Sequence, residues 1–585
     1  MYKTPKTFKL GKVEEFTDLK QLLRYGLKMY GKKTYFTNKI KDTQEIIHVS
    51  FEQMNMTADK LGTAFFKMNV MGGNIALLSE TRYEWIATYF AVTTGNGVIV
   101  PLDKELAHEQ IINFIERSET DCIVYSGDYA DLIETYAQSD ASKIRCFVNL
   151  DYTEEKAEEI RKSKNIKVYS FEEMLKIGEN ALNENCTDYL DVIIDNQKMC
   201  ACLFTSGTTG TSKAVMLSHK NITACAYHAA CDVDFTSDDV VVAVLPAHHT
   251  YETSCTFFAT YALGLEICAN ESLKTVIRNF QLYKPTKLVL VPLFIETMAK
   301  RIWDEIEKKG KTSTVKNAIK LSNGLRKVGI DIRRKLFKDV LAAFGGRLDA
   351  IICGAAPLNP ELIKTFDSFG ISIWQGYGTT ECSPLISVIP KGMHLKKMYS
   401  VGFPIGANEV KIDNPGDDGY GEILVRGSNV MIGYLNNEEA TKEAMTDDGF
   451  YRTGDIGYID DDGYLYITGR KKNVIILSNG KNIYPEEIEE YLYKADIIKE
   501  CIVVGRSAPN NAEILITAIV YPDFEKFTDS NGVVLPINEI EAEIKKAIAQ
   551  INKELPTFKH INNIEMRDIE FEKTTTKKIL RYKVK

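Results

Sequence analysis

The stretch TSGTTGTSKAVMLSH (205–219) concentrates hydroxyl-bearing residues and glycines around one lysine, and it follows the apolar run MCACLF (199–204). Glycines let a backbone come close to a ligand, and successive N–H groups with nearby hydroxyls surround an anion. This composition favours a loop that binds phosphate. The candidate ligand-binding residues of this loop are Thr205, Ser206, Gly207, Thr208, Thr209, Gly210 and Lys213.

Two further segments share this arrangement. AIICGAAP (350–357) and SIWQGYGTTE (372–381) each begin as an apolar strand and end in small or polar residues. Ligands of open parallel sheets bind just beyond the carboxyl ends of the strands. Each loop alone is typical of an ordinary strand–helix turn, but the three together predict a pocket for a nucleotide and its phosphates. Their candidate residues are Gly354, Ala355, Ala356, Pro357, Gln375, Gly376, Tyr377, Gly378, Thr379 and Thr380.

The better-known phosphate loops do not fit the sequence. The spacing G-x-x-x-x-G-K-[ST] is not met, and GYGTTE (376–381) lacks the last glycine of the dinucleotide fingerprint. The chain also has no G-x-S-x-G elbow and no H-E-x-x-H motif. These observations argue against a kinase, a P-loop NTPase, a serine hydrolase and a zinc protease.

The loops need a sheet to position them, and the first two thirds of the chain have the sequence pattern of such a sheet. Val- and Ile-rich runs alternate there with segments of helical spacing, which predicts parallel α/β sheets covered by helices. Residues 294–345 are helical in pattern and highly charged. The expected strands lie within 74–79, 97–103, 121–127, 287–292, 350–357 and 372–378.

The pattern changes after about residue 400. Turn signals such as DNPGDDG and DDDG separate short alternating strands, which predicts a small antiparallel or barrel-like unit. The basic segment GRKKN (469–473) follows. Beyond it, two strands precede a helix with an apolar stripe over 537–555. The last ~115 residues therefore predict a separate α+β domain.

Length, charge and composition limit the number of structural units and the class of protein. A chain of 585 residues predicts three to four structural units. Its formal charge of −8 gives no positive electrostatic potential that would attract nucleic acid, and the chain has no apolar stretch long enough to cross a membrane. The twelve cysteines are scattered and predict reduced, mostly buried thiols. We expect a soluble cytoplasmic protein with at most peripheral membrane contact and no evident amphipathic anchor.

These motifs, taken in order, resemble those of the adenylate-forming superfamily of acyl-CoA synthetases, luciferases and peptide-synthetase adenylation domains. The matching elements are TSGTTGTSKAV, LPAHHTYE (245–252), GAAP, YGTTE, YRTGD (451–455), GRKKNVI (469–475) and TKKILR (576–581). The starting segment LLSETRYEWIATYFAV and the segment RLDAIICGAAPL make the chain most similar to long-chain fatty-acid–CoA ligases.

The resemblance implies how the chain is divided. Residues 1–470 would form the AMP-binding adenylation domain, with α/β layers over 1–395 and the small β unit over about 396–470. Residues 471–473 would be a hinge that contains Lys472. Residues 474–585 would form a smaller, mobile α+β domain.

The resemblance also implies a reaction. ATP would activate a carboxylic acid, expected to be a medium- or long-chain fatty acid, as acyl-AMP with release of pyrophosphate, and coenzyme A would then take the acyl group. Lys578 would bridge the carboxylate and the α-phosphate, while Glu381 and the hydroxyl of Thr208 would hold Mg²⁺. His249 would lie at the mouth of the acyl pocket, and Lys472 would be the hinge residue.

Four further residues take their roles from the same resemblance. Tyr377 would stack on adenine, Asp455 would bind the ribose diol, and Arg470 would reach ribose or phosphate. Gly480 would allow pantetheine to pass.

Some alternatives stay open at this point. An acyl-carrier protein could replace coenzyme A as the acceptor, and a catalytically silent nucleotide-binding protein would retain the same loops. His248 could bind a metal with Glu252 and Cys255, although nothing else in the sequence completes that site. The chain departs from the family at CGAAP, where many relatives have two glycines, and at Glu572 and Lys577 beside the catalytic-lysine motif.

Overall fold

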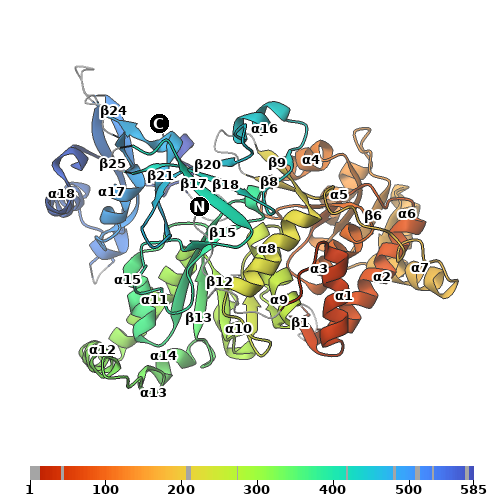
Figure 1. The fold of residues 1–585 in the computed structure, drawn as a ribbon, viewed down its shortest axis with the longest axis horizontal. Helices are drawn as coiled ribbons and strands as arrows, with labels where there is room; N and C mark the ends of the chain where they lie inside the picture. Colours follow the sequence, from red (N-terminus) through yellow and green to blue (C-terminus); the bar gives the residue numbers. More distant parts are fainter. Residues whose placement is uncertain are drawn as a thin grey trace. The chain divides into compact units, whose positions relative to one another are not determined.

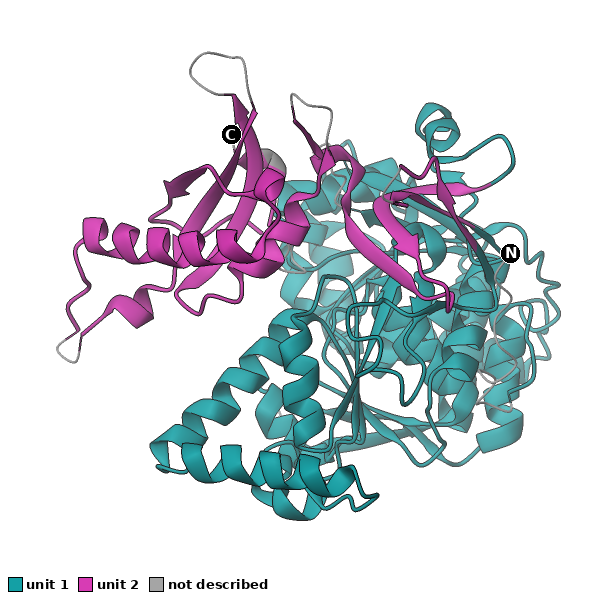
Figure 2. Cartoon of the chain, turned by 60° about the vertical axis from the view of Figure 1, so that its left-hand side comes forward, with its two compact units in different colours: residues 1–207, 211–409, 426–449 teal, residues 208–210, 410–425, 450–585 magenta. Residues whose placement is uncertain are grey.

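The computed structural model describes residues 13–40, 45–205, 212–272, 274–416, 419–477, 482–507, 514–529, 532–573 and 579–584 (Figure 1). The chain divides into two compact units (Figure 2). Unit 1 contains most of the chain up to residue 409 and the segment 426–449. Unit 2 contains 410–425 and the residues from 450 onwards.

A nine-stranded sheet of unit 1 carries two of the predicted loops. Its order is β16-β15-β14-β13-β12-β10-β11-β1-β2, and its central strands are parallel. The edges are antiparallel, at β1–β2 and at β14–β15–β16. The strands are β1 (Thr34–Lys39), β2 (Ile46–Ser50), β10 (Val240–Ala243), β11 (Glu266–Ala269), β12 (Lys287–Leu290), β13 (Ala350–Cys353), β14 (Ser372–Gly378), β15 (Leu385–Val388) and β16 (Phe403–Pro404).

An eight-stranded sheet of unit 1 carries the third loop. Its order is β19-β9-β8-β4-β3-β5-β6-β7, and it is parallel from β8 to β7. The strands are β3 (Asn74–Leu78), β4 (Val98–Pro101), β5 (Thr120–Tyr125), β6 (Cys146–Asn149), β7 (Val168–Ser170), β8 (Met199–Thr205), β9 (Lys213–Ser218) and β19 (Gly433–Tyr434).

One part of this sheet differs from the predicted strand–helix turn. β8 ends at Thr205 and β9 begins at Lys213, and the two strands pair antiparallel. A parallel crossover needs a dozen or more residues, so a connection this short forces neighbouring strands to run in opposite directions. The hydroxyl-rich segment is therefore the connection of a β-hairpin.

Helices cover the sheets of unit 1. They are α1 (Leu19–Tyr30), α2 (Phe51–Lys67), α3 (Tyr83–Thr93), α4 (His108–Arg117), α5 (Ala130–Ala137), α6 (Glu154–Lys164), α7 (Phe171–Asn183), α8 (His219–Asp232), α9 (Ala259–Leu263), α10 (Val276–Tyr283), α11 (Pro292–Lys308), α12 (Thr312–Arg326), α13 (Arg333–Leu336), α14 (Lys338–Ala342), α15 (Pro360–Ser368) and α16 (Glu438–Ala444). The helices α11 to α14 confirm the helical prediction for 294–345.

Helix α8 shows how local sequence fixes an element that the site uses. It begins directly after β9 because Ser218 and Asn221 form a capping box, in which each side chain accepts from the other residue's backbone N–H. The side-chain amide of Asn221 also donates to the backbone oxygens of Ser428 and Val430. The start of α8 is thereby joined to the segment 426–449.

Most of the strand residues in the predicted small antiparallel part lie in unit 2. β17 (Asn408–Asp413), β18 (Gly421–Gly427), β20 (Tyr451–Ile459) and β21 (Leu465–Arg470) form a four-stranded sheet in the order β17-β18-β20-β21. Both β18–β20 and β20–β21 pair antiparallel.

The rest of unit 2 is α+β, as predicted. β24 (Ile498–Ser507), β25 (Ile514–Pro522) and β26 (Asn563–Met566) form a sheet, accompanied by α17 (Pro485–Leu492) and α18 (Ile537–Glu554). Four isoleucines of α18 are buried in the core of this region, whereas Ile537, the first residue of the predicted stripe, is 55% exposed at the start of the helix. The short elements are η5 (Lys471–Asn473), β22 (Ile475–Ile476) and β23 (Asn482–Ile483).

Two sequence expectations bear on the whole chain. The structure has all twelve cysteines as free thiols, and every one except Cys186 is buried, which agrees with the prediction of mostly buried thiols. Within the ranges that the structure describes, no helix is long and apolar enough to cross a membrane.

Candidate active site

Two of the predicted nucleotide loops begin side by side. β13 and β14 are parallel neighbours, and Cys353 is in register with Gln375, so GAAP and YGTT both leave the same end of the sheet. A Cβ placed on Gly354 would lie 3.2 Å from the backbone oxygen of Gly376, and one placed on Gly378 would lie 1.8 Å from that of Pro384. Gly378 needs glycine because the neighbouring backbone is so close, whereas a side chain at Gly354 would meet a tight contact that a small shift could relieve.

Ala355 occupies the position where the chain departs from the common double glycine. Its φ is +74°, a conformation that residues with a side chain rarely adopt. Ala355, Ala356 and Pro357 are all exposed. The loop therefore keeps the backbone shape that glycine would give, at the expense of local strain.

The side chain of Gln375 is directed at the backbone of a neighbouring segment. Its amide group is buried and donates to the backbone oxygens of Met398 (2.7 Å) and Ser400 (3.0 Å). In this arrangement Gln375 holds the segment after β15 against β14, and its amide donors are directed at the protein.

An apolar cavity of about 70 Å³ opens beside these loops. Gly354, Ala355, Gly376, Tyr377 and Gly378 form one part of its wall. The rest comes from α8 and the residues just after it, from the π-helix η3 (Tyr251–Phe258), from strands β12 and β13, and from β15 with the residue before it. Such a lining suits an alkyl group, because it offers few partners to a charged one. The residues that sequence reasoning missed are Ala229, Val233, Phe235, Tyr251, Cys255, Val289, Ile352, Pro384, Leu385 and Val388.

Tyr251 and Cys255, which are four positions apart in the π-helix, both line this cavity. π-helical turns are rare and occur mostly at functional sites. Tyr251 donates a hydrogen bond to the backbone oxygen of Ile352 at 3.3 Å, and burial raises its pKa well above the ordinary value. Its hydroxyl therefore stays protonated. The LPAHHTYE motif indicated that this region belongs to the candidate site but did not indicate which side chains face the cavity.

His249 was expected at the mouth of the acyl pocket. It is not among the described residues that line the cavity, and its ring lies against that of His248, with centroids 4.0 Å apart. His248 in turn lies 3.5 Å from the carboxylate of Asp103. Burial lowers the pKa of His248 to about 3, with a smaller effect of Lys104, so its ring is neutral near pH 7.

Glu252 is fully buried behind the cavity wall. Its Oε2 accepts from the hydroxyl of Thr256 at 3.0 Å, and burial raises its pKa to about 8. The alternative metal site with His248 and Cys255 is not supported. In the part of the chain that the structure describes, no group of three or more His, Cys, Asp or Glu side chains is arranged to hold a metal ion.

A polar cluster joins the YGTTE loop to the third loop. Glu381 lies in the short helix η4 (Thr380–Cys382) and accepts from the hydroxyl of Tyr434 at 2.9 Å. The ammonium group of Lys213, at the start of β9, lies 4.5 Å from the centre of the Tyr434 ring. The backbone oxygen of Glu381 accepts from Met431 at 2.7 Å. One tyrosine thus contacts both a predicted metal ligand and a predicted phosphate ligand.

The base of the hydroxyl-rich loop is held by a residue that the motifs do not contain. The guanidinium of Arg117 donates to the backbone oxygen of Ser212 at 2.8 Å and lies over the ring of Phe204 at 5.2 Å. Thr205 donates to the backbone oxygen of Lys213 at 3.3 Å. The predicted loop residues Ser206, Gly207, Thr208, Thr209 and Gly210 lie outside the described residues.

Unit 2 contains three of the other predicted site residues. Asp455 and Arg470 face each other across β20 and β21 and form an ion pair of 2.8 Å. Arg470 also donates to the backbone oxygen of Thr453. Lys472 lies in η5, and desolvation, followed by the charge of Arg470, lowers its pKa. Lys578 and Gly480 lie outside the described residues.

Residues 26–435 match the family described as AMP-binding enzyme, and residues 472–585 match the family described as AMP-binding enzyme C-terminal domain. The chain belongs to the AMP-binding enzyme family. The resemblance inferred from the motifs is confirmed.

The chain is also similar to individual members of the family. It is 26% identical over 533 residues to long-chain-fatty-acid–CoA ligase FadD15 of Mycobacterium bovis, covering 86% of this chain and 84% of the relative. It is 29% identical over 515 residues to long-chain-fatty-acid–CoA ligase ACSBG1 of Rattus norvegicus, covering 83% of this chain and 69% of the relative.

Solved structures share the fold of this AMP-binding enzyme. The anthranilate CoA ligase AuaEII in complex with anthranoyl-AMP has a TM-score of 0.74 at 18% identity, covering 97% of this chain and 96% of that one. The adenylation domain of a carboxylate reductase from Mycobacterium chelonae has a TM-score of 0.75 at 19% identity, covering 97% and 89%. The predicted fold class, a large α/β part with a smaller α+β part, is confirmed.

Proposed function

We propose that this AMP-binding enzyme uses ATP to activate a medium- or long-chain fatty acid as acyl-AMP and transfers the acyl group to coenzyme A, releasing AMP and pyrophosphate. The observation that carries the proposal is the position of the apolar cavity, whose wall contains the GAAP and YGTT loops. This wall places apolar side chains, which suit an alkyl chain, directly beside the predicted nucleotide loops. The similarity to long-chain-fatty-acid–CoA ligases supports the same substrate class.

The reaction must overcome repulsion between two anions. A carboxylate and an α-phosphate 4 Å apart repel by about 1 kcal/mol in bulk water and by about 4 kcal/mol at an effective dielectric constant of 20. An apolar cavity strengthens this repulsion unless cations accompany the substrates. Lys578 is proposed to supply a cation between the two groups. Lys213, which lies at the base of the hydroxyl-rich loop, is proposed to contact the phosphates.

The residues present are suited to magnesium. Mg²⁺ prefers oxygen ligands, and Glu381 together with the hydroxyl of Thr208 offers that chemistry. When bound, Mg²⁺ would neutralise phosphate charge and orient the leaving pyrophosphate. The hydrogen bond from Tyr434 occupies one lone pair of Oε1 of Glu381 and leaves that carboxylate with further acceptor sites.

The remaining contacts are proposed on the family pattern. Tyr377 would stack on adenine, Asp455 would accept from the ribose hydroxyls, and Arg470 would donate to ribose or phosphate. For the second half-reaction, residues 474–585 would rotate about a hinge at Lys472, so that the loop 478–487 replaces Lys578 at the active site and Gly480 allows pantetheine to pass. The domain limits of 1–470, 471–473 and 474–585 remain part of this proposal.

The test is a measurement of pyrophosphate and AMP release with saturated acids of two to about twenty carbons, with and without coenzyme A. We expect release to be largest for acids of medium to long chain and to continue beyond one turnover only with coenzyme A. No release with any acid would contradict the proposal and favour a catalytically silent nucleotide-binding protein. Turnover only with an acyl-carrier protein would change the acceptor and leave the adenylation step intact.

A further inference from the structure

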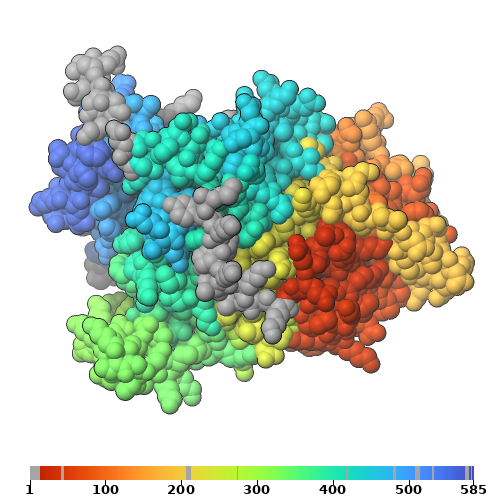
Figure 3. All heavy atoms as spheres, viewed as in Figure 1, coloured from red at the N-terminus to blue at the C-terminus, as the bar shows by residue number. Residues whose placement is uncertain are grey.

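The helical region α12–α14 of unit 1 carries a charge unlike that of the rest of the chain. Residues 311–338 contain nine basic residues and a single acidic one, Asp331, which gives a formal charge of +8 within a chain of −8. Figure 3 shows this region in green at the lower left of the surface. An isolated basic region on an acidic protein points to an anionic partner.

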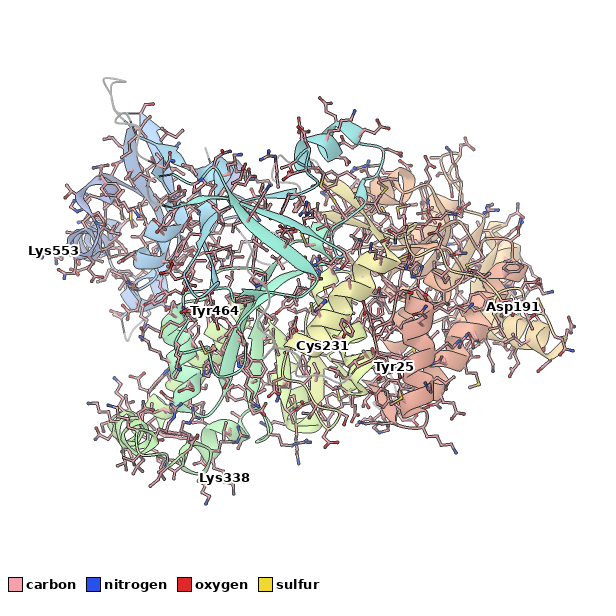
Figure 4. The ribbon with its side chains drawn as sticks, viewed as in Figure 1. Tyr25, Asp191, Cys231, Lys338, Tyr464 and Lys553 are labelled. Atoms are coloured by element: carbon pink, nitrogen blue, oxygen red, sulfur yellow. The ribbon has the colours of Figure 1, made fainter. Side chains whose placement is uncertain are left out.

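Most of this charge is available for binding. Six lysines are exposed, and the structure gives none of them an ion pair with another described residue. Figure 4 shows the labelled Lys338 at the outer edge of the region. These lysines are Lys311, Lys316, Lys320, Lys327, Lys335 and Lys338.

Exposed aliphatic side chains lie among the lysines. Leu321 is 60% exposed, Val328 72%, Ile330 50% and Leu336 41%. The opposite side of α12 is occupied differently, because Val315, Ala318 and Ile319 pack against the core of the nine-stranded sheet. The exposed residues of α12, of the turn after it and of α13 and α14 therefore combine positive charge with apolar surface. We call Leu321, Val328, Ile330, Leu336 and the six lysines the basic–apolar patch.

The patch has a fixed shape because two arginines bind the same carboxylate. Arg326, at the end of α12, and Arg333, at the start of α13, lie 2.6 and 2.8 Å from the buried carboxylate of Asp367. His394 approaches Asp367 at 3.1 Å from another segment. The turn with Lys327, Val328 and Ile330 is thereby held between two anchored points.

We propose that the basic–apolar patch binds the surface of an anionic lipid bilayer. Lysines near such a surface are attracted by acidic headgroups, and aliphatic side chains beside them enter the boundary between headgroups and acyl chains. A nucleic acid would use the lysines but would have no use for four exposed aliphatic side chains. The proposal gains its physiological sense from the proposed function, because fatty acids partition into bilayers, but the binding itself does not depend on catalysis.

The test measures sedimentation of the full-length protein with vesicles, without ATP or fatty acid. The vesicles contain phosphatidylcholine alone or with about 30% phosphatidylglycerol, at about 0.15 M salt. We expect binding to the anionic vesicles to exceed binding to the neutral ones by about tenfold or more. Equal binding of the wild-type protein to both, or no binding to either, would overturn the proposal.

Two variants separate charge from apolar contact. Replacing Lys316, Lys320, Lys327 and Lys335 together with Gln should lower binding by about tenfold or more. Replacing Leu321, Val328 and Ile330 with Ser leaves the charge unchanged and should lower binding by about fivefold or more. Unchanged binding in the first variant would overturn the proposal. The proposal would also be overturned if the second variant bound the vesicles as well as wild type does and bound a single-stranded RNA with the same affinity as the vesicles. That result would indicate a general polyanion site.

A matched control carries the same change of charge elsewhere in unit 1. Lys32, Lys67, Lys143 and Lys167 are exposed and far from the patch in sequence, and their joint replacement by Gln should leave vesicle binding within about twofold of wild type. Loss of binding in this control equal to that of the patch variant would contradict a local site. Thermal unfolding and pyrophosphate release with a short soluble acid should be unchanged in all three variants, since none touches the candidate active site.

Discussion

The hydroxyl of Tyr434 donates a hydrogen bond of 2.9 Å to Oε1 of Glu381, and the ring of the same tyrosine lies 4.5 Å from the ammonium group of Lys213. The tyrosine therefore connects a carboxylate suited to magnesium with a lysine suited to phosphate. The two contacts use different parts of the side chain. They can be removed separately.

Tyr434→Phe should remove the hydrogen bond and keep the ring beside Lys213. A hydrogen bond to a charged group contributes about 1.5–3 kcal/mol, so we expect kcat to fall about tenfold or more and the magnesium requirement to rise. Magnesium titrations of pyrophosphate release measure both effects. Tyr30→Phe, which removes a phenolic hydrogen bond to the backbone oxygen of Ala262, is the matched control. An unchanged magnesium dependence would show that Tyr434 does not position Glu381.

Lys578→Ala should separate the two half-reactions. The lysine is proposed to bridge the carboxylate and the α-phosphate, so the variant should lose pyrophosphate–ATP exchange by about a hundredfold or more and still form thioester from supplied acyl-adenylate. Lys472→Pro, at the proposed hinge, should do the opposite. Equal loss of both steps in Lys578→Ala, or an unimpaired second step in Lys472→Pro, would contradict the assigned roles.

Asp455→Ala should raise the KM for ATP about tenfold or more, since the proposed ribose contact is lost in every nucleotide-bound state. The ion pair with Arg470 introduces a second effect, because removing Asp455 leaves a guanidinium without its partner. Arg470→Ala alone and the double variant complete a thermodynamic cycle. A normal KM for ATP in Asp455→Ala would exclude the ribose contact.

Ala355→Val tests the strained turn of the GAAP loop. A β-branched residue is strongly disfavoured at a φ of +74°, so we expect the free energy of unfolding to fall by about 1–2 kcal/mol. Ala356→Val is the matched control, because Ala356 is equally exposed and lacks a positive φ. Ala355→Gly should be at least as stable as wild type. Similar unfolding temperatures for the two valine variants would contradict the prediction.

Glu252→Gln tests the buried acid. Burial raises the pKa of Glu252 from 4.5 to about 8, so between these values the folded protein keeps a proton that the unfolded chain releases. The wild-type protein therefore loses stability as the pH rises through this range, by about 1.4 kcal/mol for each unit of pKa difference. The variant should gain in Tm relative to wild type from about pH 5 to about pH 8. Glu184→Gln, at an exposed position, should show no such trend.

The sequence predicted the parts of the site that are contiguous in the chain. The strands that end in GAAP and YGTT are recognisable as apolar runs followed by small residues, and their pairing follows from ordinary α/β topology. The antiparallel hairpin of β8 and β9 was missed, although the seven residues between the strands are too few for a parallel crossover. The length of this connection was therefore the signal from which the hairpin could have been predicted.

Contacts between distant segments could not be predicted. Tyr434 meets Glu381 across 53 positions and Arg117 meets Ser212 across 95, and neither pair has a local signature. Gln375 is a polar residue in a predicted ligand-binding loop, but its side-chain amide is directed at the backbone of Met398 and Ser400. Periodicity shows which side of an element is apolar and does not show which side chain fills a given cavity.

The carboxylate of Asp367 has a consequence for comparing this enzyme with its relatives. Two arginines from separate helices end on it, so it sets the outline of the turn between them. A homologue that retained every lysine but lost this aspartate would present the same basic residues on a surface of undefined form. Surveys that count basic residues would then group proteins with different surfaces, whereas the joint presence of the aspartate and its two arginines would distinguish them.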